Sequence, residues 1–212
     1  MKKIILIGDS IRMGYDKYLK EQLEGEAEVY YPADNCRFAY YVLRHLHDWK
    51  NTHNFPEDAD VVHWNTGLWD SLTLFEDGIF TPVEVYKDTI KRIDRQIRIL
   101  FPNAKVIFAT STRVLEERFL TPHISIRYNK DTELLNNAAI EALSDTDTVI
   151  NDLYTLTANA PKEYYSDMTH LYTEEGTKLI GNKVIDSIES VLGVKFKRKD
   201  MKADTNVEVI GL

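Results

Sequence analysis

The chain has 212 residues, of which 43% are hydrophobic and 28% are charged, and this composition is typical of a globular protein and not of a disordered one. A chain of this length predicts one domain with a substantial core. The formal net charge is −8, so the protein repels polyanions, which argues against a nucleic-acid partner.

Cysteine content and the N-terminus bear on the compartment. Cys36 is the only cysteine, which leaves no intrachain disulfide and fits a reducing environment. The N-terminal apolar run, residues 4–7, is too short for a signal-peptide core or a membrane span. We therefore expect a cytoplasmic protein with no membrane partner.

The first part of the chain predicts three strands separated by helices. Residues 4–7 form an apolar run typical of a strand buried on both faces. A helix with apolar residues at helical spacing follows and ends at Gly25. A second strand is predicted at 27–31, a second helix at 38–49 and a third strand at 59–64.

The second part continues the same alternation after a long loop. We predict a helix at residues 82–100, a strand at 105–110 and a helix at 127–143. A short fifth strand at 148–151 and a last helix at 173–192 complete the pattern.

This order of elements indicates the fold class. Strands that alternate with helices are joined by right-handed crossovers, which gives a parallel sheet covered on both faces. We expect a three-layer α/β/α sandwich with a five-stranded parallel sheet of the flavodoxin-like type. It occupies residues 1–194, and residues 195–212 form a C-terminal tail whose basic run we interpret as solvated.

Side chains able to do chemistry follow the predicted strands at one edge of this sheet. Ser10, Arg37 and Asn65 come after the first three strands, and Asp167 and His170 lie just before the last helix. Ligands of such sheets bind at the carboxyl ends of the strands. The sequence therefore places a candidate site at this edge.

Ser10, His170 and Asp167 have the residue types needed for acyl transfer. A serine hydroxyl is a weak nucleophile until a base takes its proton. An aspartate three residues before a histidine can hold one ring nitrogen and leave the other to face the serine. The alternative is that Ser10 and Asp167 only cap helices, but the occurrence of both motifs favours a catalytic triad.

Three segments resemble the conserved blocks of the SGNH (GDSL) hydrolases: Gly8-Asp9-Ser10, Gly67-Leu68-Trp69-Asp70 and Asp167-Met168-Thr169-His170. Their order and spacing cover most of residues 1–192. The resemblance implies the α/β/α fold of that family, with Ser10 as nucleophile. It also implies that His170 is the general base and later the general acid, and that Asp167 orients its ring.

The sequence departs from the family pattern where the oxyanion would be held. Family members use the backbone N–H of the serine, a glycine N–H from the second block and an asparagine side chain from a Gly-x-Asn-Asp third block. Here the turn at residues 34–38 contains no glycine, and Trp69 stands in the place of the asparagine. Loss of one such donor typically lowers turnover by roughly 10²–10³-fold, so we expect a replacement.

We expect the oxyanion donors to be Ser10, Arg37 and Asn65. A backbone N–H needs no particular side chain, so Arg37 or the residue before it can still donate. Strand alternation puts the Asn65 side chain on the same side as Gly67. The alternative to Asn65 is the indole N–H of Trp69.

Substrate contacts are expected from Gly67, Trp69 and Arg113. The two other arginines that follow strands, Arg12 and Arg37, are candidates to converge with Arg113 on an anionic group. Aromatic residues around the long loop suggest a wall for a sugar ring or an acyl chain.

No cofactor or metal is predicted. The histidines lack metal-ligand spacing with other ligand types, and neither a Walker loop nor a Gly-x-Gly-x-x-Gly motif is present. Asp9 and Asp70 are further carboxylates, but we interpret them as acceptors for loop N–H groups that shape the site.

These features together predict a serine esterase acting on a small carboxylic ester, with an O-acetyl group on a carbohydrate as the expected substrate. Two alternatives remain open from the sequence. One is a catalytically silent protein that binds a glycan or a partner on the same fold, and the other is an acyltransferase that uses the same triad.

Overall fold

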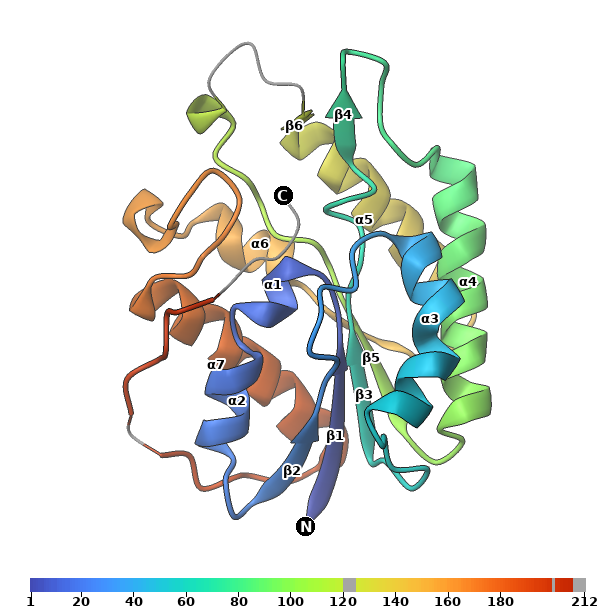
Figure 1. Cartoon of the computed structure of the whole chain (residues 1–212), viewed down its shortest axis with the longest axis vertical. Coiled ribbons are helices and arrows are strands. Elements are labelled where there is room, and N and C mark those ends of the chain that lie inside the picture. The colour runs from blue at the N-terminus through green and yellow to red at the C-terminus, as the bar shows by residue number, and fades with distance from the viewer. Residues whose placement is uncertain (120–124, 200, 208–212) are drawn as a thin grey trace.

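Five parallel strands form the central sheet of the computed structural model, in the order β2-β1-β3-β5-β7 (Figure 1). The structure describes residues 1–119, 125–199 and 201–207. The strands are β1 (Lys2–Ile7), β2 (Ala27–Tyr30), β3 (Val61–Trp64), β5 (Lys105–Ala109) and β7 (Val149–Asn151). The predicted five-stranded parallel sheet is confirmed. The strand order reverses at β1, because β2 lies on one side of it and the next strand of the sheet, β3, lies on the other.

Helices cover both faces of the sheet, which confirms the three-layer architecture (Figure 1). One face is covered by α2 (Asp16–Gln22), α6 (Leu153–Ala158) and α7 (Glu174–Leu192). The other face is covered by α3 (Ala39–Thr52), α4 (Val83–Leu100) and α5 (Asn129–Leu143). A short helix, α1 (Ser10–Met13), follows β1 directly, and two single turns, η1 (Glu116–Arg118) and η2 (Lys162–Tyr164), lie in loops.

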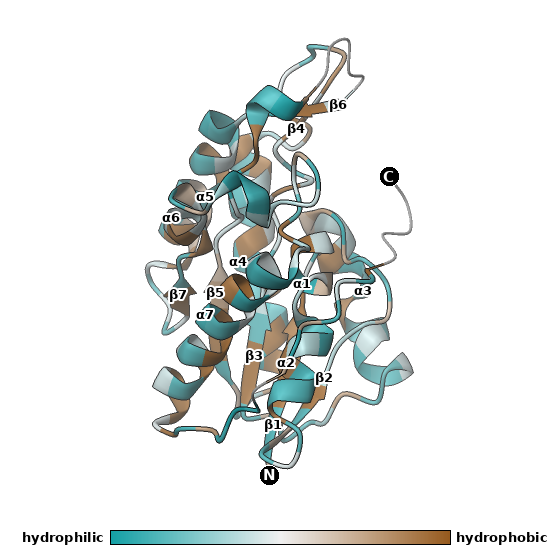
Figure 2. Cartoon of the chain, turned by 90° about the vertical axis from the view of Figure 1, so that its left-hand side faces the viewer, coloured by the Kyte–Doolittle hydropathy of each residue, from teal (hydrophilic) through white to brown (hydrophobic). Residues whose placement is uncertain are grey.

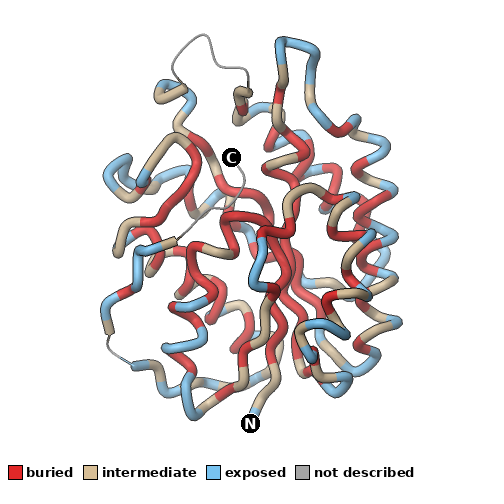
Figure 3. Tube along the Cα trace, in the orientation of Figure 1, coloured by how far each residue is buried: buried red, intermediate tan, exposed pale blue. Residues whose placement is uncertain are grey.

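Strand β1 shows how the two cores form. Ile5 and Ile7 pack with α3, α4 and α5, whereas Ile4 and Leu6 pack with α2 and α7, because successive side chains of a strand point to opposite faces. All four are fully buried, and each stabilises the fold by roughly 1.5–3 kcal/mol. Figure 2 shows the hydrophobic colour concentrated on the strands, and Figure 3 shows the same central band as buried.

The long loop after β3 contains an element that the sequence did not predict. Strand β4 (Leu72–Leu74) pairs antiparallel with β6 (Ser125–Arg127) and rises above the carboxyl edge of the main sheet (Figure 1). Residue 127, predicted to begin a helix, instead ends β6, and α5 begins at Asn129. Strands of three residues are too short to show a periodic hydrophobic pattern.

The first part of the predicted tail is docked on α7. The N–H of Phe196 donates to Oε1 of Glu189 at 3.0 Å, and Lys195 and Arg198 both pair with the same carboxylate. Glu189 is 2% exposed, so two of the basic residues compensate a buried charge and are not simply solvated. The rest of the tail is described only for residues 201–207, and residue 200 and residues 208–212 lie outside the description. No helix within the described ranges combines the length and hydrophobicity needed to cross a bilayer.

Candidate active site

Ser10 sits at the carboxyl end of β1, where the chain turns directly into α1. The side chain of Asp9 accepts the N–H of Ile11 at 3.0 Å and so caps this helix. As the first residue of the helix, Ser10 has a backbone N–H without an intrahelical acceptor. The hydroxyl of Ser10 and an N–H that takes no part in the helix therefore lie at the same edge of the sheet.

A tight loop presents Asp167 and His170. Oδ1 of Asp167 accepts the N–H groups of Thr169 at 2.6 Å and His170 at 2.8 Å, and the N–H of Ser166 donates to the carbonyl of His170 at 2.8 Å. Arg118 donates to the carbonyl of Asp167 at 3.1 Å from a separate segment. The Asp-x-x-His segment thus forms a closed turn, in which Oδ1 of Asp167 holds the backbone of the two residues Thr169 and His170.

The three side chains form a continuous hydrogen-bonded row. Nε2 of His170 lies 2.8 Å from Oγ of Ser10, and Nδ1 lies 2.7 Å from Oδ2 of Asp167. Burial alone would raise the pKa of Asp167, but hydrogen bonds from His170 and from the loop N–H groups outweigh it and hold the pKa below its usual value. The ionised carboxylate fixes the tautomer that carries its proton on Nδ1, which leaves Nε2 able to accept the proton of Ser10.

Tyr172 also belongs to this site, although sequence reasoning missed it. Its ring stacks on the His170 imidazole with centroids 4.6 Å apart, and its hydroxyl donates to the carbonyl of Ser10. A Cβ on Gly14 would lie 2.6 Å from the same ring. One aromatic residue therefore ties the histidine loop to α1, and only the folded structure shows this.

The turn that follows β2 does not offer Arg37 as a free oxyanion donor. Arg37 has φ of +52°, the left-handed region that glycine occupies without strain. Its N–H donates to Oδ1 of Asn35 at 2.8 Å, and the N–H of Cys36 donates to the carbonyl of Gly8. The geometry does not support the expected role of Arg37, because its N–H closes the turn on Asn35 and the N–H of Cys36 holds the turn against Gly8.

Asn65 lies beside Gly8 and Asp9. Its Nδ2 donates to Oδ1 of Asp9 at 2.9 Å, and the residue is 2% exposed. A Cβ on Gly8 would lie 1.9 Å from Oδ1 of Asn65, so the glycine is required for this close approach. One N–H of the amide is thus committed to the aspartate that caps α1, and the second has no acceptor among the described residues.

No protein-family model matches the sequence, and no curated protein matches it. Solved structures do match. A lipase/acylhydrolase from Enterococcus faecalis is 20% identical, with a TM-score of 0.69 over 95% of this chain and 100% of that one. A family 3 carbohydrate esterase from Talaromyces cellulolyticus is 16% identical, with a TM-score of 0.65 over 92% and 100%. An acetylxylan esterase from Geobacillus stearothermophilus is 13% identical, with a TM-score of 0.62 over 88% and 94%.

The chain has the α/β/α fold of these lipases and esterases. The expectation for the fold is therefore confirmed.

Within this fold, Gly67 has a packing role. Its φ is +132°, and a Cβ there would lie 2.7 Å from Oγ of Ser111 and 2.8 Å from the hydroxyl of Tyr86. The residue is buried, which accounts for the glycine without any substrate contact. Trp69, two residues on, is partly exposed.

Asp70 accepts hydrogen bonds from three segments of the chain. Its carboxylate accepts the N–H of Ala39 at the start of α3 and the hydroxyls of Thr66 and Thr81. Burial raises the pKa of Asp70 to about 6, although these hydrogen bonds act in the opposite direction. The residue therefore ties the third block to α3.

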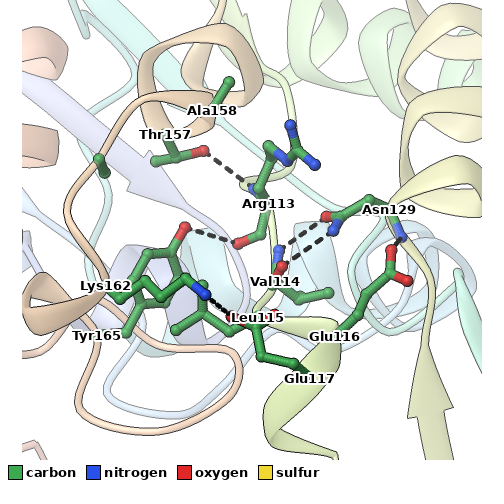
Figure 4. A pocket seen from close by; sticks show the side chains of 11 residues that line it. Arg113, Val114, Leu115, Glu116, Glu117, Asn129, Thr157, Ala158, Lys162 and Tyr165 are labelled. Atoms are coloured by element: carbon green, nitrogen blue, oxygen red, sulfur yellow. Dashed lines mark hydrogen bonds and ion pairs between the residues drawn. The ribbon is translucent and has the colours of Figure 1, made fainter.

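The three arginines considered for an anionic group do not converge. Arg12 is 1% exposed and pairs with Asp16. Arg113 stacks over Tyr154 and lines a separate pocket of about 430 Å³, shown in Figure 4. That pocket includes neither Ser10 nor the histidine loop, so its position does not support Arg113 as a contact at the serine. Within the described part of the chain, no cluster of three or more His, Cys, Asp or Glu side chains is arranged to hold a metal ion.

Proposed function

We propose that this protein is a serine esterase that hydrolyses a small carboxylic ester. The observation that carries the proposal is the hydrogen-bonded row from Ser10 through His170 to Asp167, with contacts of 2.8 and 2.7 Å. These contacts fall within the range in which a base can take a proton from a nucleophile. The likeness in fold to solved esterases and lipases supports the same class of reaction.

The reaction proceeds in two steps at Ser10. Its Oγ bonds to the carbonyl carbon of the ester while Nε2 of His170 takes the hydroxyl proton, and Asp167 stabilises the imidazolium. The protonated histidine then gives that proton to the departing alcohol, which leaves an acyl-serine. Water attacks this acyl group with His170 again as base, and the carboxylic acid is released.

The oxyanion is held by the N–H of Ser10 and the second N–H of Asn65. The first is supported by its place at the start of α1 without an intrahelical acceptor. The second is supported by the position of the amide against Gly8 and Asp9 at the edge where Ser10 lies. Arg37 is not included because its N–H is bonded to Asn35.

The substrate is an O-acetyl group on a carbohydrate. Two of the solved structures with this fold are a carbohydrate esterase and an acetylxylan esterase. Aromatic residues also gather at the edge, where Phe38 packs against Phe80 at 5.5 Å and against Tyr41 at 6.0 Å between ring centroids. Such rings suit the apolar face of a sugar.

Hydrolysis of p-nitrophenyl acetate by the protein and by its Ser10→Ala variant tests the function. The expected result is turnover that the substitution abolishes while the melting temperature stays within a few degrees. Acetate release from acetylated xylan, compared with release from a p-nitrophenyl ester of a longer acid, tests the substrate class. Equal hydrolysis by the Ser10→Ala variant, or no hydrolysis by the unmodified protein, would contradict the proposal.

A further inference from the structure

Arg127 is a buried cation whose side chain is hydrogen-bonded to the Gly67-Leu68-Trp69-Asp70 segment. It is the last residue of β6 and is 8% exposed. The pairing of β4 with β6 places it opposite Leu72, and its Nε donates to the carbonyl of Leu68 at 2.6 Å. Leu68 immediately precedes Trp69, the position at which a side-chain oxyanion donor is missing.

The charge of Arg127 has no ionic partner among the described residues. The bond from Nε to Leu68 is the only side-chain hydrogen bond of Arg127 within that part of the chain, and the side chain forms no ion pair there. Burial lowers the pKa of Arg127 to about 10, so the guanidinium stays protonated at neutral pH. A buried cation without a counter-ion is costly, so this place would stabilise a negative charge that forms close to it.

The two carboxylates that act on Arg127 from a distance are those of the site itself. Asp9 and Asp167 both raise the pKa of the guanidinium, against the larger effect of burial. Neither is an ion-pair partner, because Asp9 accepts Asn65 and Ile11, and Asp167 accepts His170. Asp9 directly precedes Ser10, and Asp167 lies behind the histidine that contacts Ser10. Arg127 therefore lies within electrostatic range of the two carboxylates that flank Ser10 and His170.

We propose that Arg127, held by its Nε on Leu68, donates from its Nη groups to the oxyanion that forms when Ser10 attacks the ester. It adds a third, charged donor to the N–H of Ser10 and the amide of Asn65. This inference rests on the proposed esterase function and adds a catalytic residue to it.

The chemistry suits a guanidinium held in this way. When the bond from Ser10 Oγ to the carbonyl carbon forms, the electron pair of the C=O bond moves onto oxygen and the serine proton moves to His170. A guanidinium offers five donors in a rigid plane. With Nε fixed on a backbone carbonyl, the Nη donors stay oriented, and a charged donor forms a stronger bond to an oxyanion than a neutral amide does. When the alcohol leaves, the C=O bond is restored and the negative charge on oxygen disappears.

Chemical rescue of Arg127→Ala tests the proposal with a neutral substrate, p-nitrophenyl acetate. Removal of one oxyanion donor is expected to lower kcat by roughly 10²–10³-fold and to change KM much less. Guanidinium ion added at millimolar concentration enters the space left by the side chain and restores part of the lost turnover. Urea, which has the same shape without the charge, does not. Arg92→Ala, at an exposed position on α4, is the matched control and keeps full activity.

Arg127→Lys keeps the assay informative if the alanine variant unfolds. A buried lysine loses its proton at lower pH than arginine does, so kcat of this variant is expected to fall at alkaline pH where that of the unmodified protein does not. A folded Arg127 variant with kcat within about twofold of the unmodified protein would overturn the proposal, as would a change confined to KM. In either case Ser10-dependent hydrolysis by the unmodified protein would leave the esterase function intact. Absence of that hydrolysis would instead reject the function, and the role of Arg127 with it.

Discussion

The ring of Tyr172 lies against the imidazole of His170, with centroids 4.6 Å apart and planes inclined by 30°. The hydroxyl of the same residue donates to the carbonyl of Ser10. Tyr172→Phe keeps the stack and removes the hydrogen bond, so kcat should fall by about fivefold, equivalent to about 1 kcal/mol. Tyr172→Ala removes both contacts and should lower kcat further. Equal kcat values for the two variants, from steady-state kinetics with p-nitrophenyl acetate, would show that the stacking does not position the histidine.

Asp167→Asn should leave the loop folded and disable the base. The amide oxygen can still accept the N–H groups of Thr169 and His170, whereas its NH₂ group would favour the wrong tautomer of the imidazole. A loss of roughly 10⁴-fold in kcat is expected, as for other serine triads. Kinetics and the melting temperature check this, with Asp145→Asn at an exposed position as the control. Activity close to that of the control would remove Asp167 from the triad.

His63 makes the fold sensitive to acid. It is fully buried between the Tyr15 hydroxyl and the Asn151 amide, and burial lowers its pKa to about 3. In the unfolded chain its pKa is about 6.5, so below that pH the unfolded state binds a proton that the folded state does not. The contribution of His63 to the free energy of unfolding is therefore fully present above pH 6.5 and is lost as the pH falls toward 3. The loss between pH 7 and pH 5 is about 2 kcal/mol.

His63→Gln should remove this dependence, because glutamine does not titrate and keeps polar atoms for both neighbours. Urea unfolding of both proteins at pH 7 and pH 5 measures it. Equal losses of unfolding free energy in the two proteins would assign the acid sensitivity to other groups.

Asn65→Ala should lower kcat far more than Trp69→Phe. The amide of Asn65 offers an N–H to the oxyanion in the proposed mechanism and also holds Asp9 at the start of α1. A loss of roughly 10²-fold or more is expected for the alanine variant. Trp69→Phe removes the indole N–H and keeps an aromatic ring, so its kcat should change little. The reverse order would transfer the donor role to the indole.

The parts of the site that the sequence predicts are those built by local motifs. Ser10 follows a buried strand and Asp167 precedes His170 by three residues, so each motif folds within a few residues and the parallel sheet brings their ends together. The fold class follows from the alternation of strands and helices in the same way.

The remaining features depend on contacts between distant segments. Arg127 reaches the carbonyl of Leu68 because β4 pairs with β6. Strands of three residues are too short to show a periodic hydrophobic pattern in the sequence. Arg37 has an ordinary sequence context, but the side chain of Asn35 takes its N–H. Arg113 follows a strand as expected, yet the loop carries it into the separate pocket of Figure 4. Position after a strand thus predicts the edge of the sheet and not the direction of a side chain.

The claim on which the account depends is that His170 activates Ser10. A fluorophosphonate probe reacts with an activated serine and not with an ordinary one. Incubation of the protein with the probe, followed by mass spectrometry of its peptides, should give one adduct on Ser10. The adduct should be absent from Ser10→Ala and strongly reduced in His170→Ala. A folded protein that takes no label, or a label that persists unchanged in the Ser10→Ala variant, would contradict the account.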